Sequence, residues 1–215
     1  MRAQAQIIFD THSLEDASRV AAALIAVLKE NGIAARVANV GEASDSEDVL
    51  TIYTDGGCDL KKDGIGAWAF RIEKDGVMLA EESECWLNTT NNRMELLAVI
   101  RALEDTEIGP KIKLFSGSEY VIKGITQWCR NWVRNGWVTR NGQPVVNKDL
   151  WQRLIDLYQL HNVTFTHVKG HSGNPGNERV DTLCTEAMQA GFKMVLAGET
   201  ATIPIDTIDP SRVAA

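Results

Sequence analysis

The sequence predicts an α/β fold, in which a mixed five-stranded sheet is flanked by helices and preceded by a small βαβ-like N-terminal unit. From residue 49 onward, three consecutive strand-like segments are followed by alternating helix-like and strand-like segments, the order expected of a mixed sheet covered by helices. The chain has 215 residues, enough to bury a core without disulfide or metal staples. Its 44% hydrophobic and 24% charged residues are typical of a globular chain rather than a disordered one.

Residues 1–40 predict a strand, a helix and a second strand. Ser13 is suited to cap the helix, because Asp16 follows three residues later and an apolar run comes next. Residues 41–48 are acidic and rich in small residues, which indicates a linker. With a single aromatic residue and more acids than bases, we interpret residues 1–48 as a structural or partner-binding unit, whose protein partner the sequence does not identify.

The elements after the linker follow from alternation, helix caps and breakers. The first strand is expected to end at Asp55 and to lead into a loop, and Lys74-Asp75-Gly76 predicts a hairpin between the next two strands. Residues after Gly191 show no clear period, so a domain at 49–190 is followed by a C-terminal tail at 191–215. The predicted strands are 49–54, 65–73, 77–87, 111–115 and 163–168, and the predicted helices are 91–105, 119–133, 148–160 and 178–190.

Charge and cysteine content exclude several classes of protein. Lys and Arg number 22 and Asp and Glu number 29, a net charge of −7, so no general attraction to nucleic acids or anionic membranes is expected, although a local basic patch is compatible with it. The opening MRAQAQIIFD has no apolar segment and no run approaches ~18 apolar residues, so we expect neither secretion nor membrane spanning. The four cysteines form no CxxC pair, which favours reduced thiols and a cytoplasmic location.

Three carboxylates are predicted to lie where a strand ends or a helix begins. Asp55 follows the first strand, and ligands collect at such strand ends in open α/β sheets. Glu95 is placed in the first turn of its helix, and Asp181 in the first turn or so of the last helix. Each has a simpler interpretation, because a carboxylate near a helix start stabilises the helix dipole by about 0.3–1 kcal/mol, and Asp55 beside two glycines could form an ordinary turn.

Four sequence motifs favour the ligand interpretation of these carboxylates: TDGGC, TTNNRMEL, SEYVIKGITQWCRNW and VKGHSGNPGNERVD. In this order and spacing, between about residues 50 and 188, they resemble the type 1 (bacterial ribonuclease HI-like) ribonuclease H family. The resemblance implies a ribonuclease H-like fold and endonucleolytic cleavage of the RNA strand of RNA–DNA hybrids with two Mg²⁺ ions, for which Mn²⁺ is a substitute.

The same resemblance implies the roles of individual residues. Asp55 matches the aspartate that bridges both ions, and Glu95 and Asp181 match two further metal ligands. Oxygen ligands of this kind suit hard divalent cations, and two such ions can activate the attacking water and stabilise the leaving oxygen. His171 matches the histidine of a mobile loop that assists proton transfer or product release.

One position departs from the family pattern. Where the family has a fourth carboxylate, in a Thr-Asp-Ser-like word, this sequence has Gly117, which offers no side-chain ligand. Three explanations remain open: a deliberate alteration that inactivates the enzyme, a natural variant with reduced or rearranged chemistry, and a non-catalytic hybrid-binding module. Glu119, two residues later, is expected to enter the helix rather than replace the ligand. A junction resolvase on the same fold is a further alternative, which NNRMEL and GITQW disfavour.

Residues 111–153 carry eight bases and two acids, in contrast to the acidic chain as a whole. The matching family segment is a basic handle that grips the DNA strand, which makes Arg130 and Arg134 candidate phosphate ligands. Trp128 and Trp132, four residues apart, are also candidate substrate-binding residues, although tryptophans at this spacing usually pack in a core.

The second group of candidate substrate-binding residues lies before the helix at 91–105. Thr90, Asn91 and Asn92 are good helix caps, and in the family this stretch reaches the minor groove and a DNA phosphate. Cys58 and the loop after it correspond to residues near the RNA strand, where the 2′-hydroxyl groups distinguish RNA from DNA. The loop at 59–63 lacks the Gly/Pro-rich family form, so the correspondence extends only to Cys58.

Overall fold

The computed structural model describes residues 48–59, 64–170 and 173–206. The predicted N-terminal unit, residues 41–47 of the predicted linker and His171 therefore lie outside the described residues. The chain divides into two units, residues 1–46 and 47–215, and all the described residues belong to the second.

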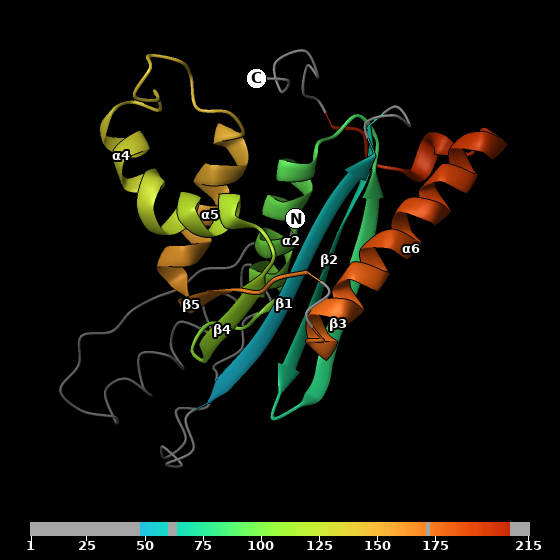
Figure 1. Ribbon diagram of the computed structural model, residues 1–215, viewed down its shortest axis with the longest axis horizontal. Coiled ribbons are helices and arrows are strands. Elements are labelled where there is room, and N and C mark those ends of the chain that lie inside the picture. The colour runs from blue at the N-terminus through green and yellow to red at the C-terminus, as the bar shows by residue number, and fades with distance from the viewer. Residues whose placement is uncertain (1–47, 60–63, 171–172, 207–215) are drawn as a thin grey trace, which may run out of the picture. The chain divides into compact units, whose positions relative to one another are not determined.

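Five strands form one mixed sheet in the order β3-β2-β1-β4-β5 (Figure 1). The first three strands form an antiparallel meander, whereas β4 and β5 run parallel to β1. The hairpin between β2 and β3 turns at Asp75 and Gly76, whose φ angles of 52° and 78° suit a tight hairpin turn. The strands are β1 (Val49–Asp59), β2 (Ile65–Lys74), β3 (Val77–Trp86), β4 (Lys111–Ser116) and β5 (Asn162–His167). The prediction of a mixed five-stranded sheet flanked by helices is confirmed.

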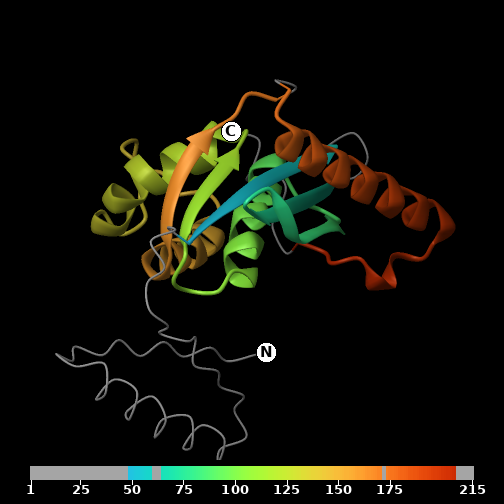
Figure 2. The same ribbon diagram turned by 90° about the horizontal axis from the view of Figure 1, so that it is seen from below.

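Helices cover both faces of the sheet (Figure 2). α2 (Asn91–Asp105) and α5 (Lys148–Leu160) lie on one side, and α6 (Pro175–Ala197) packs on the other. Between β4 and α5 the chain forms α3 (Glu119–Lys123), a π-helix (Gly124–Trp128) and α4 (Cys129–Arg134). Within the described part of the chain, no helix combines the length and the apolar character needed to cross a membrane.

The alternation of side chains along β1 divides the core in two. Leu50 and Ile52 belong to the main core between the sheet and α2, whereas Tyr53 packs against a smaller cluster under α6. The buried members of this smaller cluster are Ala67, Ala69, Val180 and Cys184. Because these side chains are small, the start of α6 approaches the sheet closely.

β1 is longer than predicted. Its parallel ladder with β4 ends at the pair Thr54 and Ser116, close to the predicted strand end. Its antiparallel ladder with β2 continues to Asp59, which pairs with Ile65. The prediction of a loop directly after Asp55 is therefore wrong, because β2 supplies hydrogen-bond partners beyond the end of β4.

The helix predicted at 119–133 is interrupted by the π-helix. The N–H of Cys129 donates to the carbonyl of Gly124, five residues earlier, which is the π-helical pattern. A Cβ on Gly124 would overlap the ring of Trp151 in α5. The chain can pass this close to Trp151 only because residue 124 has no side chain.

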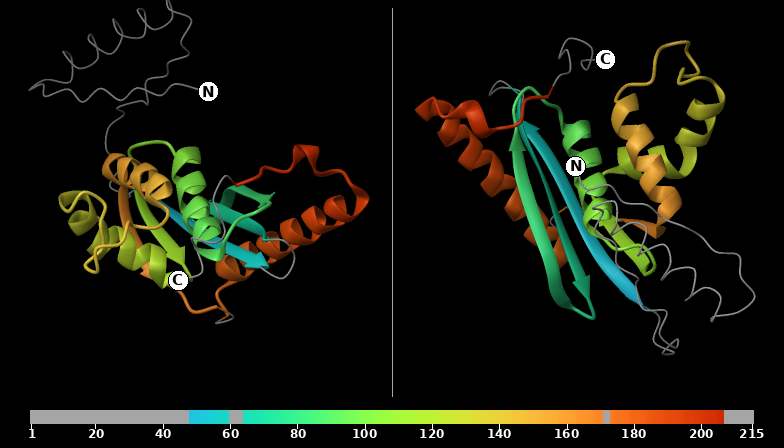
Figure 3. Two further views of the ribbon diagram at one scale, coloured as in Figure 1. Left: turned by 90° about the horizontal axis from the view of Figure 1, so that it is seen from above. Right: turned by 180° about the vertical axis from the view of Figure 1, so that it is seen from behind.

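The residues after the predicted helix end also differ from the sequence prediction. α6 continues to Ala197 rather than ending at residue 190, and Gly198 ends it with a φ of 75°. The chain then returns across the end of the sheet (Figure 3). The backbone N–H of Leu87 donates to the carbonyl of Pro204 at 2.9 Å, and the backbone N–H of Asp206 donates to the carbonyl of Leu87 at 2.9 Å. Residues 203–206 are thus part of the packed structure.

Candidate functional site

The parallel pairing of β1 and β4 places two positions at the same edge of the sheet. Thr54 and Ser116 form the last pair of the parallel ladder. Asp55 and Gly117 are the residues that follow them, on neighbouring strands. The carboxyl ends of parallel strands are where ligands bind in α/β sheets, so the position predicted to lack a carboxylate lies beside Asp55.

Glu95 is brought to Asp55 by a close approach of two backbones. A Cβ on Gly56 would overlap the backbone of α2 at Met94 and Glu95, so β1 and α2 can touch here only because residue 56 is glycine. The two carboxylates are near enough that the charge on Asp55 contributes to raising the pKa of Glu95.

The carboxylate of Glu95 is held by two neighbours. It accepts hydrogen bonds from Asn91 Nδ2 at 2.8 Å and from the hydroxyl of Ser118. Burial is the main cause that raises the pKa of Glu95, followed by the opposing effect of the Ser118 hydrogen bond and then by the charge on Asp55. Ser118 also caps α3 by accepting from Val121 N–H at 3.2 Å. The sequence analysis did not single out Ser118, although a serine one residue before a helix is a recognisable cap.

Asp181 approaches the same region from α6. The buried thiol of Cys184 donates to the carbonyl of Ala67 at 3.2 Å. The pKa of this thiol is raised chiefly by burial and further by the charges of Asp55 and Asp181. The thiol is therefore within electrostatic reach of both carboxylates.

The helix-dipole interpretation does not fit two of the three carboxylates. α2 begins at Asn91 and has no acidic residue in its first turn, so Glu95 lies in the second turn rather than the first. α6 begins at Pro175 and its first-turn acid is Glu178, so Asp181 also lies further along its helix than predicted. Because the dipole effect is confined to the first turn, it does not explain either position.

Gly117 leaves room for a side chain. Its φ lies outside the left-handed region, and a Cβ built on it would lie 3.7 Å from the carbonyl oxygen of Val168, an ordinary contact. Its own carbonyl lies 3.2 Å from Nε2 of His167. Glu119 does not replace the missing ligand, because it begins α3 and forms an ion pair with Lys123.

The donor chemistry of this edge suits a hard divalent cation, because all three side chains offer carboxylate oxygens. A cation would also offset the repulsion that contributes to the raised pKa of Glu95. Within residues 48–59, 64–170 and 173–206, however, no three His, Cys, Asp or Glu side chains form a group ready to hold a metal ion. The three carboxylates are thus the right type of ligand for such an ion, but position 117 contributes no side chain to the site.

The stretch before α2 does not cap the helix as predicted. Thr90 stands at the cap position, but its hydroxyl makes no capping bond and, among the described residues, this buried oxygen has no partner. Asn91 and Asn92 are exposed at the start of the helix. Cys58 donates to the carbonyl of Thr89 at 3.2 Å, and burial is the main cause that raises the pKa of its thiol to about 11.

The basic segment separates into a packed part and an exposed part. Trp128 and Trp132 have ring centroids 5.8 Å apart, and Trp132 lies 5.4 Å from the buried Trp151. This arrangement supports the packing interpretation of the tryptophans. Arg130 and Arg134 are exposed and form no ion pair with the described residues.

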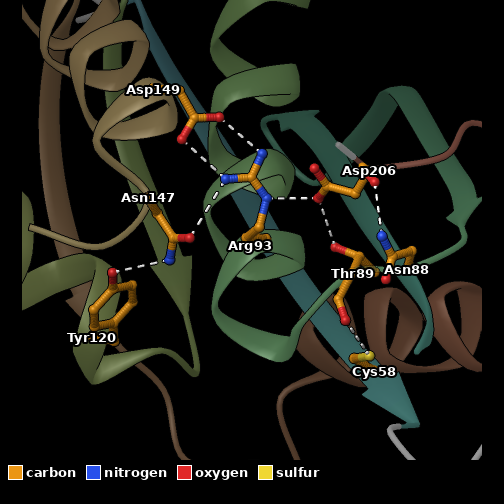
Figure 4. A network of polar contacts seen from close by, with 8 residues as sticks. All are labelled: Cys58, Asn88, Thr89, Arg93, Tyr120, Asn147, Asp149 and Asp206. Carbon is orange, nitrogen blue, oxygen red and sulfur yellow. Dashed lines mark hydrogen bonds and ion pairs between the residues drawn. The ribbon is translucent and has the colours of Figure 1, made fainter. Parts of the chain in front are cut away.

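A buried network connects the start of α2 to the C-terminal residues (Figure 4). Arg93, in the word NNRMEL, donates to both carboxylate oxygens of Asp149 at 3.0 and 2.8 Å and to Asp206 at 2.6 Å. Asp206 also accepts from the hydroxyl of Thr89 at 3.0 Å. The sequence analysis missed this network, because Arg93 and Asp206 are 113 residues apart and no local pattern joins them.

Comparisons with known proteins identify one family over most of the described residues. A family model described as RNase H matches residues 47–189. A protein named Ribonuclease H from Hahella chejuensis (strain KCTC 2396) is 47% identical over 154 residues, which cover 70% of this chain and 97% of that protein. A Ribonuclease H from Hydrogenovibrio crunogenus (strain DSM 25203 / XCL-2) is 47% identical over 139 residues, or 65% of this chain and 94% of that protein.

Solved structures show the same fold. LC9-RNase H1, a type 1 RNase H with the type 2 active-site motif, superposes with a TM-score of 0.59 at 21% identity, over 80% of this chain and 93% of that chain. LC11-RNase H1, solved in complex with an RNA/DNA hybrid, superposes with a TM-score of 0.52 at 24% identity, over 66% of this chain and 97% of that chain.

Proposed function

The chain belongs to the ribonuclease H family, and we propose that it is an endonuclease that hydrolyses the RNA strand of RNA–DNA hybrids. The observation that supports this most is the close approach of β1 and α2 at Gly56, which brings Glu95 to Asp55, while α6, which carries Asp181, packs against the same strand. The type 1 relative solved with an RNA/DNA hybrid has the same fold. The free state of all four cysteines fits a cytoplasmic location.

In this proposal the three carboxylates hold divalent cations, Mg²⁺ or Mn²⁺. Two such ions supply an activated water and stabilisation of the leaving oxygen. The chain's own contribution is to hold the ligands: Ser118 and Asn91 fix both oxygens of Glu95. The pKa of Glu95 is raised above its usual value. A nearby cation would lower this pKa again and so favour the ionised carboxylate, which is the form that can act as a ligand. His171 keeps the role that the family resemblance implies, proton transfer or product release.

We propose that the reaction is impaired because Gly117 leaves the metal site without its fourth carboxylate. Asp55, Glu95 and Asp181 would hold one ion, and a second ion would be bound only loosely without a carboxylate at position 117. A metal stabilises transition-state charge by several kcal/mol, and about 1.4 kcal/mol corresponds to a factor of ten in rate. Loss of one well-held ion should therefore slow cleavage at least about a hundredfold.

Substrate binding is assigned to two surfaces. Arg130 and Arg134 are exposed and bind phosphates of the DNA strand, which gives affinity without sequence readout. Thr90, Asn91 and Asn92 form the surface that meets the minor groove, with Asn91 and Asn92 exposed at the start of α2 and the hydroxyl of Thr90 buried beneath them. Cys58, which is anchored to the carbonyl of Thr89, lies next to the RNA strand. In this arrangement Trp128 and Trp132 chiefly support the arginines.

A non-catalytic hybrid-binding module is the second candidate, favoured by the glycine at position 117 and by the lack of a ready-made metal group among the described side chains. The test incubates a labelled RNA–DNA hybrid with the protein in Mg²⁺ and in EDTA, with Asp55→Asn as the matched variant. Slow, metal-dependent cleavage of the RNA strand that Asp55→Asn abolishes supports the nuclease. Hybrid binding in EDTA together with no cleavage in Mg²⁺ or Mn²⁺ by any variant, including Gly117→Asp, supports the binding module.

A further inference from the structure

A row of four side chains crosses the sheet beneath the start of α6. The register pairs Tyr53 of β1 with Phe115 of β4 on one side and with Arg71 of β2 on the other, and Arg71 pairs with Glu81 of β3. The rings of Tyr53 and Phe115 stack at 5.2 Å, and Arg71 donates to Glu81 at 2.8 Å. Side chains two residues apart on a strand share a face, so the row lies directly next to Asp55.

The first turns of α6 rest on this row. A Cβ on Gly176 would overlap the ring of Tyr53, so the helix backbone lies against that ring. One turn later, Arg179 donates through Nη2 and Nε to the two carboxylate oxygens of Glu81, at 2.6 and 3.3 Å. Arg179 is two residues before Asp181. The ion pair therefore joins an edge strand to the helix segment that carries a proposed metal ligand.

The apolar contacts alone define the position of this helix incompletely. The buried members of the cluster between α6 and the sheet are two alanines, one valine and one cysteine, and Leu183, Ala187 and Met188 pack against them only partly buried. These contacts hold the helix against the sheet, but they are not directional. A two-pronged guanidinium–carboxylate contact is directional. Glu81 is itself held from the opposite side by Arg71, which also pairs with Glu73 at 2.6 Å.

We propose that Glu81 is a positioning residue: through Arg179 it fixes the start of α6 so that Asp181 stands beside Asp55. The inference rests on the proposed function, because it assigns Asp181 to the metal site. Residues that orient metal ligands without touching the metal typically change metal affinity or activity by about 10–100-fold when they are replaced. A misplacement of ~1 Å at a reacting centre has an effect of similar size.

The experiment uses the full chain and compares Glu81→Gln with Glu82→Gln. Both changes remove one negative charge from adjacent residues of β3, but Glu82 is exposed and forms no ion pair with the described residues. Two quantities are measured: Mg²⁺ affinity by calorimetry and amide hydrogen exchange at residues 178–182. We expect Glu81→Gln to weaken Mg²⁺ binding about tenfold and to speed exchange in this segment, whereas Glu82→Gln changes neither.

A second pair of variants tests whether Glu81 acts through Arg179. Arg179→Gln should have the same effects as Glu81→Gln, and the double variant should be no worse than the more affected single variant, because both changes remove one interaction. Equal Mg²⁺ affinity and equal exchange in Glu81→Gln and Glu82→Gln would overturn the proposal. So would faster exchange throughout the domain rather than in 178–182. If even the unaltered chain fails to bind Mg²⁺, the metal-dependent function fails, and the exchange comparison alone decides whether Glu81 positions α6.

Discussion

The guanidinium of Arg93 donates to the carboxylate of Asp206 at 2.6 Å, and the exposed fractions of these side chains are only 6% and 2%. This ion pair attaches the segment that leads to Asp206 to α2, the helix that carries Glu95. The chain from Gly198 to Asp206, which lies beyond the segment matched by the family model, is therefore part of the packed domain.

Asp206→Ala should strongly destabilise the domain. Arg93 keeps its ion pair with Asp149, but its Nε and the hydroxyl of Thr89 lose their buried acceptor, and each donor left unsatisfied costs about 1–3 kcal/mol of unfolding free energy. Asp149→Ala is the control. It also removes a carboxylate that pairs with Arg93, but the Asp149 side chain is 61% exposed. Its expected cost is about 1 kcal/mol or less. Urea unfolding measures both, and a larger loss for Asp149→Ala would contradict the assignment of Asp206 as the main anchor.

Gly117→Asp should raise Mg²⁺-dependent cleavage of hybrid by about a hundredfold or more, because it restores a carboxylate beside Asp55. The position tolerates a side chain, since its φ is ordinary and its Cβ would contact only the carbonyl of Val168. Single-turnover rates across a Mg²⁺ titration measure the effect. Gly117→Asn adds the same bulk without the charge and should remain slow. Equal rates for the glycine and aspartate forms would mean that another ligand completes the site.

Replacing Arg130 and Arg134 together by alanine should weaken hybrid binding and flatten its salt dependence, since each lost phosphate contact lowers the slope of log K against log[salt] by up to about 0.9. Cleavage at saturating substrate should change less. Arg101 and Arg153 provide a matched double variant, because both already pair with Glu104. A salt slope unaltered by the first pair would identify the segment as scaffold only.

The unfolding free energy should fall as the pH drops below about 6.5, the ordinary histidine pKa, because of His161. This side chain is buried, and its Nδ1 has no partner among the described residues. Burial lowers its pKa, against a smaller opposing effect of a hydrogen bond with the backbone of Leu103. The unfolded chain therefore takes up a proton at a higher pH than the folded chain does, which favours unfolding. His161→Gln should flatten the decline between pH 7 and 5.5 in urea titrations.

Local sequence patterns were sufficient to predict a helix or strand where its ends depend on nearby residues. The helices at 91–105 and 148–160 have the bounds that the sequence predicts. The predictions were wrong where a distant partner decides: β2 extends β1 to Asp59, and the ring of Trp151 accompanies the π-helical turn at Gly124. No periodicity within those segments reports these contacts.

The site shows the same division. Asp55, Glu95 and Asp181 could be named because their surrounding words resemble a family, and the structure brings Glu95 close to Asp55. The contacts of Ser118, Arg93 and Asp206 could not be found in this way, because the partners lie 23 and 113 residues apart in the chain. The row from Phe115 to Glu81 is likewise visible only once the strand register is known.

The π-helical turn gives the segment 119–134 a phase as well as a length. Each residue of an α-helix turns by about 100° about the axis, and the turn at Gly124 accommodates one residue more than a regular helix would. If the same residues formed a regular α-helix, those after the turn would be rotated by about that angle, and Arg130 and Trp132 would no longer point where they do. Deleting a single residue from 124–128 would instead let the segment become a regular helix in which the downstream residues keep their present faces. Alignments of relatives across this turn should thus treat a one-residue gap as the loss of the π-helical turn, not as a change of face.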